Sequence, residues 1–90
     1  MKKYVLSYAH CDCEDESLYN MTIGIYDSLK EAHEAMLEEI KYEFMEESED
    51  EDEIMNYDPK EDEEWSISDA VAESHSEYLV RRYAVSRVEF

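Results

Sequence analysis

The stretch Ile23–Ala32, IGIYDSLKEA, joins the end of a strand pattern to the start of a helix pattern. Its first residues alternate, with the two isoleucines on one side and Gly and Tyr on the other, as in a half-buried strand. Ser28 and Glu31 then match a capping box, in which each side chain accepts from an unpaired backbone N–H at the start of a helix. The sequence therefore predicts a change from strand to helix immediately after Asp27.

Upstream of this junction, two alternating segments predict a β-hairpin. Over residues 3–9, Tyr4, Leu6 and Tyr8 fall on one face, which is typical of a strand. A second alternating segment runs from Tyr19 to Tyr26. The polar and acidic residues between the two segments are expected to form the connection.

Downstream of the junction, apolar residues recur at helical spacing and indicate an amphipathic helix. Its apolar stripe is expected to face the sheet and consists of Leu29, Ala32, Met36, Ile40 and Phe44. Glu31, Glu34 and Glu38 gather on the opposite side. Acidic pairs at four-residue spacing destabilise a helix, so packing must hold this one in place.

Residues 46–64 form an acidic connection, with twelve Asp or Glu in nineteen residues. Its charge and its single proline are typical of a loop or a frayed helix end. Within it, Ile54, Met55 and Tyr57 form a small apolar island, which we expect to dock on the core as a short helical turn.

The remaining residues predict two further strands. Trp65, Ile67 and Val71 are interpreted as one face of a third strand, and Tyr78 to Phe90 as a long final strand with a bulge near Ser86. The predicted fold class is α+β. We expect an antiparallel sheet of about four strands with one helix packed on one face, in the order β-β-α-β-β.

Composition limits the chain to one domain and sets its charge. Ninety residues support a single core, here spanning 1–90, and 26 Asp and Glu against 8 Lys and Arg give a net charge of −18. Such a surface repels nucleic acid and anionic membranes and attracts basic protein surfaces. No signal-peptide or membrane-span pattern is present, and Cys11 and Cys13 are too close in sequence for an unstrained disulfide, so we expect a cytoplasmic protein.

Three arrangements of residues could carry chemistry, and each lacks an essential part. His10, Cys11 and Cys13 resemble zinc ligands, but no second cysteine pair completes a four-ligand site. A Cys13–His33 dyad would need an oxyanion motif that the sequence does not contain. The run from Asp50 lacks the glycine of a calcium loop, with Met55 in its place. We therefore expect no enzyme activity, no cofactor and no metal site.

Two parts of the sequence show a resemblance to known proteins. They are the junction 23–32 with the Glu34-Ala35-Met36 that follows it, and the ending Val88-Glu89-Phe90. They resemble elements of short acidic proteins of gut Firmicutes and of their phages and mobile elements. The resemblance covers about a fifth of the chain and implies a fold and a source, but no catalytic residue. Small acidic proteins of this kind include anti-CRISPR and anti-restriction inhibitors that mimic DNA.

The leading hypothesis is an acidic inhibitor that mimics nucleic acid and occupies a basic site on a nucleic-acid-handling protein, such as a host defence nuclease. The alternative is a small cytoplasmic interaction or regulatory domain whose acidity serves solubility and whose sheet edge or apolar surface contacts a partner by strand addition. A metal- or calcium-responsive protein is the third hypothesis. The first hypothesis needs acids gathered on one face, and its partner-binding residues are Glu31, Glu34, Glu38, Glu49, Asp50, Glu51, Asp52, Glu53, Asp62 and Glu63.

Overall fold

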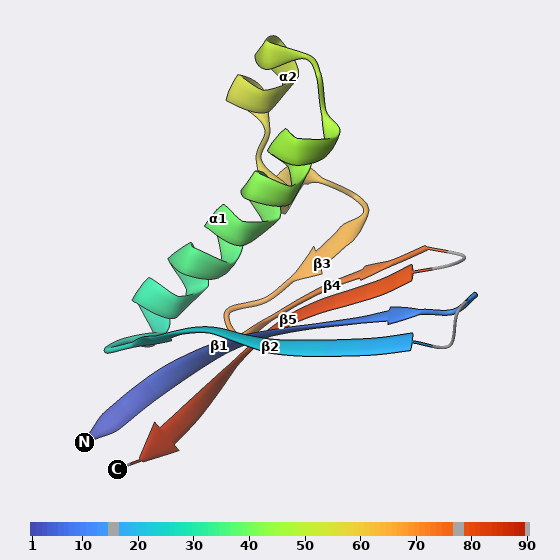
Figure 1. Cartoon of the computed structure of the whole chain (residues 1–90). Helices are drawn as coiled ribbons and strands as arrows, with labels where there is room; N and C mark the ends of the chain where they lie inside the picture. Colours follow the sequence, from blue (N-terminus) through green and yellow to red (C-terminus); the bar gives the residue numbers. More distant parts are fainter. Residues whose placement is uncertain (15–16, 77–78, 90) are drawn as a thin grey trace.

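The computed structural model describes residues 1–14, 17–76 and 79–89 and has an α+β fold (Figure 1). Its elements are β1 (Lys2–Asp12), β2 (Ser17–Tyr26), α1 (Leu29–Glu47), α2 (Glu51–Asn56), a 3-10 turn η1 (Pro59–Glu61), β3 (Trp65–Ile67), β4 (Val71–His75) and β5 (Leu79–Glu89). The strands form one antiparallel sheet in the order β2-β1-β5-β4-β3. The predicted fold class and hairpin are confirmed, but the sheet has five strands, where about four were predicted.

The hydrophobic core lies between α1 and one face of the sheet, which we call the covered face. Its buried side chains come from α1 and from four strands, and they are Leu6, Met36, Ile40, Trp65, Ala72 and Tyr83. Burying an apolar side chain of the larger sizes contributes about 2 kcal/mol, so this small core has to offset the self-repulsion of the charges.

The junction between β2 and α1 follows the predicted capping box. The backbone N–H of Glu31 donates to Ser28 Oγ at 3.1 Å. The Glu31 carboxylate accepts in return from the backbone N–H of Asp27 at 3.2 Å, one residue earlier than in the standard motif. Asp27 also pairs with Lys3 of β1, so the start of the helix is tied to the neighbouring strand.

The predicted third strand is confirmed for Trp65 and Ile67, which share one face of β3, and is wrong for Val71, which begins β4 after a tight turn. Ser68 makes this turn, since its backbone N–H donates to the Val71 carbonyl at 2.8 Å and its Oγ accepts from Val71 N–H. Ile67 pairs with Ala72, which places both side chains on the covered face and Val71 on the other face. A hydroxyl that satisfies a turn was not separable from a strand residue in the sequence.

The predicted bulge near Ser86 is also wrong. Strand β5 pairs with β1 from Leu79 to Glu89 without a register shift. The apolar residues change face without a bulge, because Val85 packs against the core on the covered face, whereas Val88 lies on the other face beside Lys3 and is 36% exposed. The irregularity lies instead between β1 and β2, where pairing shifts at Leu6 and Ser7 and leaves Ile23 as the extra residue.

The acidic connection is more structured than the sequence indicated. Asp50 caps α2, and Tyr57 then returns to the core, where its ring stacks on Phe44 with 3.9 Å between ring centroids. The predicted docking of the apolar island is confirmed for Tyr57. It is wrong for Met55, whose side chain is 80% exposed.

Candidate protein-binding surface

The acidic residues are divided unevenly between the two sides of the sheet. Residues 28–64, which we call the helical layer, hold 17 of the 26 Asp and Glu and three lysines. Figure 1 shows α1 and α2 of this layer on one side of the sheet, with α2 projecting beyond the end of α1. The negative charge is therefore concentrated on the helix side of the molecule.

The opposite face of the sheet carries little charge, and no described element covers it. Its side chains include Val5, Ser7, Ala9 and Ala84, which the pairing of β1 with β5 places together. The charged side chains at its described positions are Lys3, Glu73 and Arg82, together with the titratable His75. Negative charge is therefore distributed asymmetrically between the two sides of the sheet. A binding surface on the helical layer requires this asymmetry.

Three of the predicted partner-binding residues lie along α1. Glu34 and Glu38 are exposed, and no hydrogen bond or ion pair of their side chains is found among the described residues. Glu31 is exposed as well, although its carboxylate also caps the helix. With a rise of about 1.5 Å per residue, Glu31 and Glu38 are separated by roughly 10 Å along the axis.

Five further predicted residues, 49–53, follow α1, with Glu49 and Asp50 in the connection and 51–53 in the first turn of α2, and all five are exposed. Asp50 accepts from the backbone N–H of Asp52 at 2.9 Å and of Glu53 at 3.4 Å, so it holds the turn. Ser48 Oγ donates to Glu53 at 3.4 Å. None of these hydrogen bonds involves the carboxylates of Glu49, Glu51 and Asp52. These three carboxylates are therefore available to a partner.

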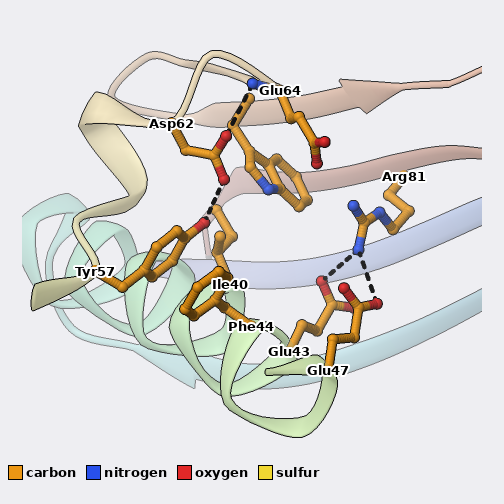
Figure 2. A pocket seen from close by; sticks show the side chains of 9 residues that line it. Ile40, Glu43, Phe44, Glu47, Tyr57, Asp62, Glu64 and Arg81 are labelled. Carbon is orange, nitrogen blue, oxygen red and sulfur yellow. Dashed lines mark hydrogen bonds and ion pairs between the residues drawn. The ribbon is translucent and has the colours of Figure 1, made fainter. Parts of the chain in front are cut away.

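Asp62 and Glu63 differ from each other in their surroundings. Asp62 is half-buried and accepts from the Tyr57 hydroxyl at 2.8 Å and from the Glu64 N–H at 3.0 Å (Figure 2). Burial, and next the hydrogen bond to Asp62, raise the pKa of Tyr57 well above its ordinary value. Asp62 therefore holds the connection against the core, whereas Glu63 is exposed.

Figure 2 shows a polar cluster around Arg81 that the sequence analysis did not identify. The Arg81 guanidinium lies 3.4 Å from Glu43 and 4.0 Å from Glu47, and 5.0 Å from the ring centroid of Trp65. The cavity beside it measures about 20 Å³, which is the size of one water molecule. The cluster joins α1 to β5 and is too small for a substrate.

The carboxyl of Glu43 is shifted by this environment. Burial raises the pKa of Glu43 above its ordinary value of 4.5, while the charge of Arg81 partly opposes the shift. The tyrosines facing it are also affected, since burial, followed by the negative charge of Glu43, raises the pKa of Tyr8 to about 12 and that of Tyr83 further. The sequence contained an indication of this cluster. Arg81 and Tyr83 are two residues apart in the same strand, so both side chains fall on the covered face.

The histidines and thiols do not converge on a site. His10 stacks on Tyr19 on one face of the sheet, whereas Cys11 pairs with Leu18 and points to the other. His33 Nδ1 lies 3.1 Å from the Asp69 carbonyl oxygen, so one of its ring nitrogens has a hydrogen-bonding partner in the backbone. Within the described ranges, no three His, Cys, Asp or Glu residues are arranged to hold a metal ion.

Comparison of the chain with protein-family models, curated proteins and solved structures found no match. Among the described residues, no helix has the length and apolar character needed to cross a membrane. The class of protein that the fold and surface define is thus a small α+β domain with a strongly acidic helical layer on one side of its sheet.

Proposed function

We propose that this protein is a non-enzymatic, acidic binding protein that occupies a basic, nucleic-acid-binding site on another protein. The observation that carries the proposal is the concentration of 17 of the 26 acidic residues in the helical layer. The target class is a nuclease or another protein that handles nucleic acid in the cytoplasm. A host defence nuclease inhibited by a phage or mobile-element protein fits this description.

The field of the helical layer supports mimicry of nucleic acid. Duplex DNA carries one negative charge per ~1.7 Å of its axis, and a channel lined with Lys and Arg is attracted to any surface of similar charge density. The twelve acids among the nineteen residues 46–64 give such a density within a short length of chain.

The layer also offers apolar contact among its charges. Tyr42 and Met45 lie on the exposed side of α1, with 58% and 48% of their surface accessible. Protein interfaces combine an apolar or aromatic centre with a charged rim, and an aromatic ring can occupy a position where a base would stack.

Release by DNA tests the proposal. The protein is immobilised and incubated with nuclease-treated bacterial lysate, and retained proteins are eluted either with duplex DNA or with mononucleotides at matched ionic strength. We expect duplex DNA to release proteins that mononucleotides leave bound, because the two ligands would share one site. Equal release by both eluents would contradict the proposal and indicate nonspecific ionic capture.

A further inference from the structure

The free edge of β2 differs from the rest of this chain in its lack of charge. Its ten residues, Ser17–Tyr26, contain no Asp, Glu, Lys or Arg and form the longest such run in the sequence. Strand β2 lies at the edge of the sheet (Figure 1), and Leu18, Tyr19, Met21 and Ile25 are 44–69% exposed. Proteins usually protect a long edge strand with charge or proline, so this edge is suited to a partner.

The bulge divides β2 into two parts of unequal length. From Ser17 to Thr22 the pairing with β1 is continuous, and the shift follows beyond it. On the side away from β1, no described strand pairs with these residues. Alternate N–H and C=O groups of Ser17–Thr22 therefore present a regular template for one more strand.

A groove of about 350 Å³ lies beside this template, between β2 and α1. Tyr8, Met21, Ile23 and Tyr83 line its sheet side, and Glu39 and Glu43 line its helix side. The groove thus has an apolar floor and an acidic wall. A Lys or Arg side chain matches both, because its aliphatic stem packs on apolar surface while its cation reaches a carboxylate.

The two acids of the wall are not equivalent. Glu43 already contacts Arg81 at 3.4 Å. Glu39 is half-buried, and its side chain makes no hydrogen bond or ion pair within the part of the chain that the structure describes. A cation entering the groove would therefore pair first with Glu39.

We propose that β2 binds an extended, basic segment of a partner by strand addition at Ser17–Thr22, with one Lys or Arg side chain in the groove against Glu39. This inference rests on the proposed function, which requires a basic partner, and adds to it the mode of binding. Backbone pairing supplies affinity, and the groove selects the cationic side chain.

A second copy of the chain fits this edge less well. Pairing β2 with another β2 would bring uncharged side chains to the groove and leave Glu39 without a cation. It would also bring two helical layers, each with 17 acids and three lysines, to the same side of one sheet. Charge complementarity therefore favours a basic partner strand.

The test uses peptides selected from a random-sequence display library against the whole protein. We expect selected peptides to carry Lys or Arg at alternate positions of an otherwise uncharged segment, and to slow amide hydrogen exchange within Ser17–Thr22. Neutralising the wall acid with Glu39→Gln should weaken their binding about tenfold, as expected for a partly desolvated ion pair. Asp69→Asn removes one exposed charge from the turn between β3 and β4, at the opposite edge of the sheet from β2, and should change binding by less than about twofold.

Several outcomes would overturn the inference. One is a selection that yields no binder, and another is a set of binders that leaves exchange in β2 unchanged. A third is equal weakening by both variants, which would indicate general attraction to negative charge. Light scattering adds a fourth, because a dimer whose Ser17–Thr22 amides are already protected would show that a second copy occupies the edge. Circular dichroism of both variants establishes that each is folded.

Failure of this inference can be separated from failure of the proposed function. If selected peptides map to α1 and α2 while duplex DNA still releases captured proteins, the acidic surface is the binding site and the edge is not. If peptides bind β2 through Glu39 but DNA releases nothing, strand addition stands and mimicry of nucleic acid fails.

Discussion

The Arg81 guanidinium lies 3.4 Å from the carboxylate of Glu43 and thereby ties the central strand β5 to α1. The side chains are 16% and 26% exposed, so both charges are partly withdrawn from water. Removing one member leaves the other buried without its partner, which costs more than the pair itself contributes.

Arg81→Gln should therefore lower the free energy of unfolding by about 2 kcal/mol, a value reduced from that of fully buried pairs because water still reaches this one. The control is Arg82→Gln, which removes an exposed arginine 3.4 Å from Glu73 on the uncovered face. This control substitution should lower the free energy of unfolding by no more than about 0.5 kcal/mol. Urea unfolding followed by circular dichroism measures both, and equal losses would contradict the structural role of Arg81.

The pKa of Glu43 predicts a pH dependence of stability. Burial raises the pKa of Glu43 above its ordinary value of 4.5, so the folded protein binds this proton more tightly than the unfolded chain. Stability from this group is fully present below the ordinary value and is lost as pH rises through the raised folded value. The free energy of unfolding should accordingly increase as pH falls from about 8 to about 5. Glu43→Gln should flatten the profile in the acidic part of this range, and an unchanged slope would contradict the assignment.

The Tyr57 hydroxyl predicts how firmly the acidic connection is held. Tyr57→Phe keeps the ring on Phe44 but removes the donor to Asp62, leaving a half-buried carboxylate without it. The variant should lose about 1 kcal/mol of stability and expose the connection to protease. Limited proteolysis, with cleavage mapped by mass spectrometry, would show faster cutting in residues 48–64. An unchanged cleavage rate would mean that stacking on Phe44 suffices.

Salt should stabilise the protein, because the helical layer repels itself. Glu34 and Glu38 are four residues apart on the exposed side of α1, and such pairs cost a few tenths of a kcal/mol each at low salt. Raising salt through tens to hundreds of millimolar shortens the Debye length to about 10 Å or less and should raise the Tm. Replacing both residues with Gln should reduce this rise, and a Tm independent of salt would contradict self-repulsion.

Local patterns predicted the elements whose signals lie within a few residues of each other. The capping box at Ser28 fixed the start of α1, and the alternation around Leu6 predicted β1, because both depend on neighbouring side chains. The turn at Ser68 was missed, since serine there satisfies backbone groups without a Gly or Pro to mark it. Because this turn was not predicted, β3 and the start of β4 were predicted as one strand.

The candidate surface was less accessible to sequence reasoning than the fold. The exposed positions of Glu34 and Glu38 followed from helical periodicity, whereas the return of Tyr57 onto Phe44 depends on a contact between separate elements. Asp62 was predicted to bind a partner, and the structure shows that its carboxylate also holds the connection through the Tyr57 hydroxyl. The edge of β2 could not be recognised before the strand order was known.

The most direct test of the helical layer as the binding surface compares two variants of equal net charge in the DNA-release assay. One neutralises exposed acids of the helical layer, with Glu34→Gln, Glu38→Gln and Asp52→Asn. The other neutralises exposed acids outside the layer, with Glu14→Gln, Asp69→Asn and Glu89→Gln. If the helical layer is the binding surface, the first variant should lose most of the DNA-releasable capture and the second should retain it, because the position of the charges matters more than their number. Equal loss in both variants, or equal retention, would contradict the assignment of the helical layer as the binding surface.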